Sequence, residues 1–144
     1  MQSRIELKFD ITNQDEKKLV SNLCLLKEFE TRKITSIYFD NEDFRFYHDS
    51  EEGITPRHKL RLRYYNDNFN KKNLEIKSTL PTIRKKITIK DVDINQIKKY
   101  TIKYKLPNNV KPCIKISYLR KYFKNKKGRF NIDYNITFGK YSIV

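Results

Sequence analysis

Glycine, proline, cysteine and histidine are scarce in this chain of 144 residues, and tryptophan is absent. With three Gly and four Pro, the sequence excludes a collagen-like or low-complexity protein. A hydrophobic content of 38% and an aromatic content of 13% favour a globular fold over a disordered one. Cys24 and Cys113 lie far apart, outside any C-x-x-C motif or Cys/His cluster, which predicts a reduced, intracellular protein.

Long apolar runs are also absent. No run approaches the ~20 residues of a membrane-spanning helix, and the first residues lack the charged and apolar regions of a signal peptide. The sequence therefore predicts a cytoplasmic protein whose association with the cytoplasmic face of a membrane, where it occurs, comes through a partner. The length predicts one domain over residues 1–144.

Acidic residues are few: 17 Asp and Glu face 32 Lys and Arg, giving a formal charge of +15. Such a chain repels itself unless an anionic partner offsets part of the charge. Nucleic acid, an anionic membrane surface and a small polyphosphorylated ligand are the candidates. We rank nucleic acid last, because its binding usually needs exposed aromatics beside a basic stripe, whereas here Tyr and Phe mostly share the apolar phase.

Periodicity predicts an α+β chain dominated by β structure. Period-two alternation predicts strands at 3–11, 32–40, 58–65, 73–79, 83–90, 112–123 and 129–138. Asn13 with Glu16 and Asp93 with Gln96 resemble capping boxes, which predict a helix over 14–26 and a short helix that ends before Pro107. Residues 44–56 are assigned only as a connection with local structure.

The polar phases of these strands are nearly all ionic. The clearest example is Lys59, Arg61 and Arg63, which alternate with Leu60 and Leu62. One such strand fits the solvated face of an ordinary antiparallel sheet. Because the pattern recurs in five strands, we expect a closed antiparallel barrel with about two flanking helices and an ionic lumen that binds phosphates. The scattered acids Glu6, Glu75 and Asp133 suggest oxygen ligands for Mg²⁺ or Mn²⁺.

An ordered set of motifs runs from residue 3 to about 138. It comprises Arg4-x-Glu6-x-Lys8, Ser36-Ile37-Tyr38-Phe39-Asp40, Lys59-x-Arg61-x-Arg63-Tyr64-Tyr65, Leu74-Glu75-Ile76-Lys77, Tyr118-x-Arg120 and Arg129-x-Asn131-x-Asp133. In this order the motifs resemble the vacuolar transporter chaperone (VTC) polyphosphate polymerase domain, within the triphosphate tunnel metalloenzyme superfamily.

The resemblance implies an eight-stranded tunnel that binds a triphosphate and uses a divalent metal for phosphoryl transfer, with the γ-phosphate of ATP added to polyphosphate. The residues expected to carry catalysis are Lys8, Arg61, Arg63, Lys77 and Arg120. Substrate binding is assigned to Lys59, Arg84, Lys86 and Arg129, with Lys59 at the tunnel mouth as an alternative. Metal binding is assigned to Glu6, Glu75 and Asp133.

Several alternatives stay open. Glu75 could instead pair with Lys77 or Arg61, and Arg120 shares its phase with apolar residues, so it faces inward only if a bulge lies nearby. Members of the family usually continue to a final strand with a metal-binding Glu, whereas this sequence stops at Val144. The domain therefore either lacks that last strand or binds metal through the acids named above. A polymerase, a triphosphatase and a non-catalytic polyphosphate or nucleotide sensor all remain compatible.

Overall fold

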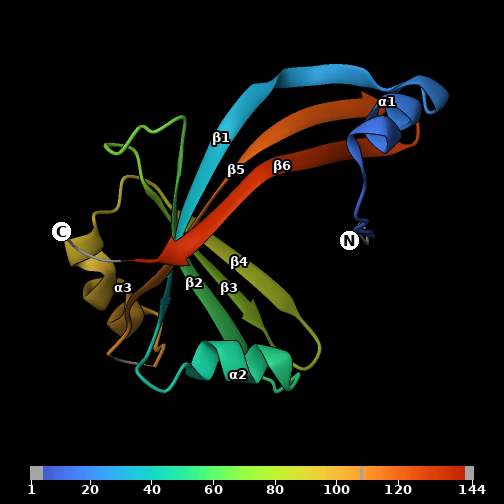
Figure 1. The fold of residues 1–144 in the computed structure, drawn as a ribbon. Helices are drawn as coiled ribbons and strands as arrows, with labels where there is room; N and C mark the ends of the chain where they lie inside the picture. The colour runs from blue at the N-terminus through green and yellow to red at the C-terminus, as the bar shows by residue number, and fades with distance from the viewer. Residues whose placement is uncertain (1–4, 108, 142–144) are drawn as a thin grey trace. The chain divides into compact units, whose positions relative to one another are not determined.

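The computed structural model describes residues 5–107 and 109–141. These residues form six strands, three α-helices and one 3₁₀ turn (Figure 1). In chain order the elements are α1 (Asn13–Asn22), β1 (Leu26–Asp40), α2 (Arg45–Glu51), β2 (Arg57–Tyr65), β3 (Asn73–Thr79), β4 (Arg84–Ile89), the 3₁₀ turn (Ile94–Gln96), α3 (Ile97–Lys103), β5 (Lys111–Asn125) and β6 (Gly128–Lys140). The prediction of a mainly β chain is confirmed.

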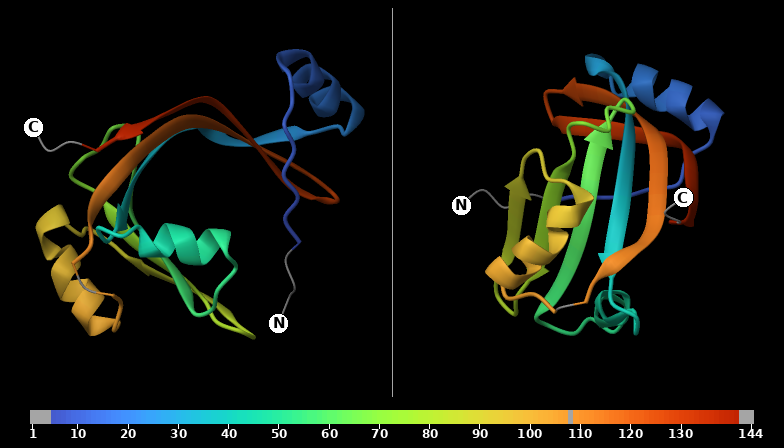
Figure 2. Two further views of the ribbon diagram at one scale, coloured as in Figure 1. Left: turned by 60° about the horizontal axis from the view of Figure 1, so that its bottom comes forward. Right: turned by 90° about the vertical axis from the view of Figure 1, so that its left-hand side faces the viewer.

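All six strands belong to one sheet with the order β4-β3-β2-β1-β5-β6. The pairs β1–β2, β2–β3 and β3–β4 are antiparallel, and Figure 2 shows β2, β1 and β5 side by side. Strands β4 and β6 lie at the two edges, so the prediction of a closed barrel is wrong. About eight strands are needed to leave an interior just wide enough for side chains, and six would not enclose long Arg and Lys residues.

The predicted strand at 3–11 is also wrong for the residues that the structure describes. Residues 5–12 precede α1 without forming a strand, and residues 3 and 4 lie outside the described part of the chain. Ile5, Leu7 and Phe9 are 84%, 73% and 78% exposed. Alternation makes a segment amphipathic, but a strand also needs a neighbour that bonds its backbone groups. None of the described strands pairs with this segment.

The helices differ from the prediction at their ends and in their number. The capping box of α1 joins Thr12 to Asp15 instead of Asn13 to Glu16. The helix ends at Asn22 because Cys24 has a φ of 49°, a conformation that stops a helix, and β1 then begins at Leu26. The structure adds α2 within residues 44–56. The capping box of Asp93 and Gln96 is confirmed, and it begins the 3₁₀ turn that leads into α3.

Asp40 fixes the start of α2. Its Oδ1 accepts a hydrogen bond from the Phe46 backbone N–H at 2.9 Å, and its Oδ2 accepts one from Tyr47 at 3.0 Å. These N–H groups in the first turn of a helix have no partner inside the helix. The buried carboxylate of Asp40 therefore has a structural role at the end of β1.

The chain divides into two compact units. The first unit comprises Met1–Thr31 and Lys121–Ile132, and the second comprises Arg32–Arg120 and Asp133–Val144. In the first unit, α1 is held by an ion pair between Glu16 and Lys121 and by a 3.0 Å hydrogen bond from Asn125 Nδ2 to the Leu23 carbonyl. That residues 1–144 act as one domain stays a prediction.

The hydrophobic core lies in the second unit, on one face of the sheet. Leu60, Leu62 and Tyr64 of β2 are buried there with Leu74 and Ile76 of β3. Helices α2 and α3 add Phe46 and Ile97, while the connections before and after α3 add Val92 and Leu106. The opposite face of the same strands is consequently left to the polar phase. Among the described residues, no helix is long and apolar enough to cross a membrane.

Candidate phosphate-binding face

Alternation along β2 separates its two kinds of side chain. Leu60, Leu62 and Tyr64 enter the core, so Arg61 and Arg63 lie on the opposite face. We call this side of the sheet the polar face. The arginines are not solvated, because their side chains are only 11% and 12% exposed.

Strand register arranges the polar face in rows across the sheet, since directly paired residues lie on the same side. One row joins Arg63 to Ser36 and Asn73, and the next joins Arg61 to Tyr38, Glu75 and Thr88. Two further rows follow along β2: they are Lys59, Lys77 and Lys86, and then Arg57, Thr79 and Arg84.

Strand β5 continues the polar face. On the other side of the sheet, the Thr35 hydroxyl lies 3.0 Å from that of Ser117, so the next residue, Tyr118, turns toward the arginines. The Tyr118 hydroxyl accepts a hydrogen bond from Arg63 Nη2 at 3.5 Å. Arg120 follows on the same phase, and its guanidinium lies 5.3 Å from the Tyr118 ring. Arg120 therefore shares a face with Arg63 through ordinary alternation.

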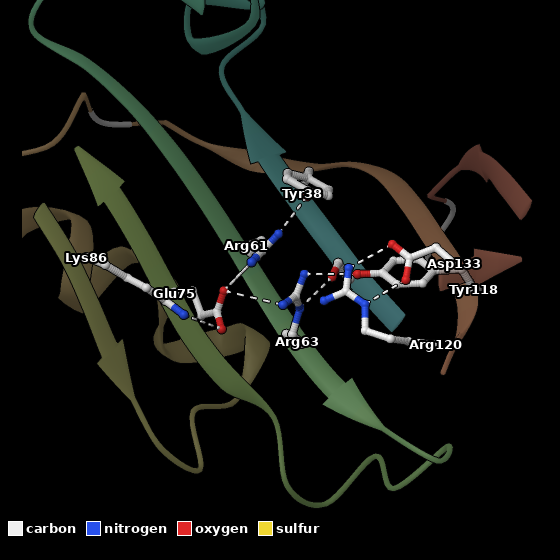
Figure 3. A network of polar contacts seen from close by, with 9 residues as sticks. Tyr38, Arg61, Arg63, Glu75, Lys86, Tyr118, Arg120 and Asp133 are labelled. Atoms are coloured by element: carbon white, nitrogen blue, oxygen red, sulfur yellow. Dashed lines mark hydrogen bonds and ion pairs between the residues drawn. The ribbon is translucent and has the colours of Figure 1, made fainter. Parts of the chain in front are cut away.

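Glu75 is the centre of the network in Figure 3. Its side chain is 6% exposed, and it accepts hydrogen bonds from Arg61 Nε at 2.7 Å and Lys86 Nζ at 3.2 Å, with Arg63 Nη1 at 4.0 Å. Burial alone would raise the pKa of Glu75, but the charge and hydrogen bonds of Arg61, the charge of Arg63 and the bond from Lys86 bring it below its usual value. The carboxylate is therefore ionised at neutral pH. Of the two pairings that the sequence allows, Glu75 forms the one with Arg61 and not the one with Lys77.

Three hydroxyl groups hold the arginines in place. Arg61 Nη1 donates to the Tyr38 hydroxyl at 2.9 Å, and Arg63 Nε donates to the Ser36 hydroxyl at 3.1 Å. Tyr118 supplies the third hydroxyl, which accepts from Arg63. The sequence predicts no role for these hydroxyls, although Ser36 and Tyr38 share one strand phase. Guanidinium groups fixed in this way lose little freedom when they bind an oxyanion.

The row of Lys59, Lys77 and Lys86 places three ammonium groups on neighbouring strands. Lys86 reaches Glu75, whereas no hydrogen bond or ion pair joins Lys59 or Lys77 to another described residue. Like charges directly opposite each other in a sheet are destabilising. Burial, then the charges of Arg61, Lys86 and Arg63, lower the pKa of Lys77 despite the opposing effect of Glu75. A bound anion would relieve this repulsion.

A second carboxylate of the face belongs to Asp133 on β6. Arg120 donates to it through both Nε and Nη2, at 2.6 Å and 2.7 Å (Figure 3). This two-pronged geometry is the one in which guanidinium also binds phosphate. The pair is about one quarter to one third exposed, so a phosphate could compete with Asp133 for the same donors.

Most of the residues that the sequence predicts for the site meet on the polar face. They are Lys59, Arg61, Arg63, Glu75, Lys77, Arg84, Lys86, Arg120 and Asp133. The other three belong to the first unit. Glu6 and Lys8 lie exposed in the segment before α1, and the exposed Arg129 forms an ion pair of 3.4 Å with Glu28. Roles for these three in the site stay predictions.

A metal cage made by protein groups alone does not fit the described residues, which contain no group of three His, Cys, Asp or Glu side chains suited to a metal. Glu75 and Asp133 are instead bound by arginines. Mg²⁺ commonly uses one or two carboxylates together with substrate phosphates. The described residues therefore fit a metal ion only where a phosphate ligand supplies most of its oxygens.

A model of the VTC domain matches residues 2–142, nearly the whole chain. The comparison with curated proteins finds no match.

Proposed function

The chain belongs to the VTC domain family, and from this premise we propose that its polar face binds the phosphates of ATP and polyphosphate for phosphoryl transfer. The observation that supports the proposal best is the fixed pair Arg61 and Arg63, beside a lysine row whose charge is only partly balanced. In such a site cations outnumber carboxylates before any ligand binds. Successive phosphates of a polyphosphate chain can each lie near a different row of the polar face, so one ligand offsets the charge of several rows.

Phosphoryl transfer needs positioning and charge stabilisation more than covalent catalysis. In the proposed reaction, Arg61 and Arg63 hold phosphate oxygens bidentately, while Lys59, Lys77 and Lys86 offset charge on the neighbouring phosphate. Tyr38 and Ser36 keep the guanidiniums aimed. A Mg²⁺ or Mn²⁺ ion bound to the phosphates would offset further charge as bonds to the transferred group change.

The experiment is product analysis with ATP and Mn²⁺, read as polyphosphate, inorganic phosphate and ADP. Polyphosphate with ADP supports a polymerase, whereas phosphate with ADP and no polymer indicates a triphosphatase. Arg63→Ala should remove the activity, and Arg45→Ala, an exposed arginine of α2, is the control. Activity that is equal in all three proteins would contradict the proposed site.

A second candidate is a polyphosphate or nucleotide sensor that binds without turnover. It is favoured by the engagement of Glu75 and Asp133 with arginines, which leaves no described carboxylate cluster for a metal. Tight binding of triphosphate in the presence of Mn²⁺, with no change in the ligand over hours, would support the sensor. Measurable turnover that depends on Arg63 would exclude it.

A further inference from the structure

A cavity of about 360 Å³ lies at one end of the polar face, and the phosphate-binding proposal does not use it. Ligand pockets in proteins usually begin at about 300 Å³. The cavity is lined by Tyr65, Asn68, Lys71, Asn73, Lys90 and Asp91. All of these residues belong to the second unit, which also holds the arginines.

Register places the cavity directly beyond Arg63. Asn73 is the residue of β3 paired with Arg63, and Tyr65 follows Arg63 by two positions on β2. Two residues of a strand span roughly 6.6 Å and return to the same face. The cavity therefore continues the polar face by one row, and a ligand could occupy both the cavity and the arginines.

The lining keeps two cations, Lys71 and Lys90, and adds amide, aromatic and carboxylate groups beside them. Asn68 and Asn73 each offer both a hydrogen-bond donor and an acceptor, and Tyr65 offers an aromatic ring. Asp91 adds a carboxylate, which would repel a further phosphate but can accept hydrogen bonds from sugar hydroxyls. Stacking, amide contacts and a carboxylate for hydroxyls are the means by which proteins bind a nucleoside.

We propose that this cavity binds the nucleoside of a nucleoside triphosphate whose phosphates lie on Arg63 and Arg61. The inference rests on the proposed phosphate site and adds the orientation of its substrate. With the base and ribose beyond Arg63, the triphosphate runs along β2 through the Arg61 row. Its terminal phosphate then lies nearest Lys59, Lys77 and Lys86. The reacting end of the nucleotide is thus assigned to the lysine row.

The test compares ATP with inorganic triphosphate by calorimetry, without metal and at fixed ionic strength. Asn68→Ala alters the cavity in the connection between β2 and β3, and Asn70→Ala in the same connection but outside the lining is its matched control. Tyr65→Ala removes the ring. Because Tyr65 is part of β2, the melting temperature of the Tyr65→Ala variant is measured to check that it folds. Asn68 lies outside the strand, so the result for Asn68→Ala does not depend on the fold of β2.

We expect wild-type protein to bind ATP more tightly than triphosphate. Tyr65→Ala should weaken ATP about tenfold, the size of one lost base stacking, and Asn68→Ala should weaken it several-fold. Neither change should alter triphosphate affinity by more than about twofold, and Asn70→Ala should resemble wild type. Equal loss of both ligands, or no loss of ATP, would overturn the nucleoside site. Failure of the proposed phosphate site looks different, since neither ligand would then bind and Arg63→Ala would change nothing.

Discussion

Replacing Glu75 by Gln tests whether the polar face is held together by one buried carboxylate. The variant keeps the size of the side chain and one oxygen acceptor but removes the negative charge shared by Arg61, Arg63 and Lys86. Breaking a buried ion pair costs about 3–5 kcal/mol, and a hydrogen bond to a charged group is worth about 1.5–3 kcal/mol. Since Gln retains part of the bonding, we expect a loss of roughly 2–4 kcal/mol in the free energy of unfolding.

Thermal unfolding in EDTA measures this loss, which should appear as a fall in Tm of roughly 5–15 °C at pH 7. The effect should shrink in acid. Because the folded pKa of Glu75 lies below its usual value, its stabilisation is complete above the usual pKa and is lost as the pH falls through the folded one. Triphosphate should stabilise the variant more than wild type, because the bound anion replaces the missing charge.

The matched control is Glu42→Gln. Glu42 also pairs with a lysine, Lys111, at 3.4 Å, but its side chain is 82% exposed. Exposed pairs contribute under about 1 kcal/mol, so its Tm should hardly change. Two results would refute the idea that the Glu75 carboxylate balances the neighbouring cations when no phosphate is bound. One is equal Tm values for the two variants, and the other is a smaller rise in Tm with triphosphate in Glu75→Gln than in wild type.

Further predictions concern the cations. Arg63→Ala should weaken triphosphate binding by about 1.5–3 kcal/mol in calorimetry, while Arg45→Ala leaves it unchanged. Triphosphate at 100 times its Kd should stabilise wild-type protein by about 2.7 kcal/mol in thermal unfolding, and the same concentration of sulfate far less; equal effects would argue against recognition of a phosphate chain. The pKa of Lys77 is lower in the folded protein than in the unfolded chain, so its charged form lowers the free energy of unfolding at neutral pH. This cost disappears as the pH rises from the folded to the unfolded pKa of Lys77. Lys77→Met should therefore raise the Tm of the ligand-free protein at pH 7 and weaken triphosphate binding, whereas a lower Tm would contradict the repulsion in the lysine row.

The strands that the sequence predicts well are those whose two phases differ in kind. Residues 58–65 alternate between Leu or Tyr and Lys or Arg, and β2 is found at Arg57–Tyr65. The same alternation at 5–11 gives no strand, because amphipathicity does not supply a pairing partner. The sequence does not predict residues 26–31 as part of a strand, since the apolar spacing of the preceding helix extends to Leu26, whereas β1 begins there. A single residue, Cys24 in the left-handed conformation, decides that boundary.

The polar face was predictable as a list of cations but not as a network. Phase alone predicts Arg61, Arg63, Glu75 and Lys77 on one face. The apolar phase of each strand faces the core, so the polar phases of all strands lie on the opposite side. Which cation pairs with Glu75 depends on the register between β2 and β3, and the sequence does not encode that in any local pattern. For Arg120 the phase is misleading, because its apolar neighbours on that phase predict the core face. Tyr118, on the same phase, instead accepts a hydrogen bond from Arg63 and so lies on the polar face.

Because Glu75 and Asp133 are both paired with arginines, we expect phosphate binding and phosphoryl transfer to differ in their need for a metal. In the proposed function, a phosphate enters the face by taking donors from Asp133 or by adding to the lysine row, and neither step needs a metal. Transfer is more demanding, since the described carboxylates form no cage and the Glu75 carboxylate is already bound by Arg61 and Lys86. Affinity for triphosphate should consequently depend little on Mn²⁺, whereas any turnover should depend on it strongly. The two dependences can be measured on the same protein, and a metal requirement for binding itself would mean that the arginines and lysines do not suffice to hold the phosphates.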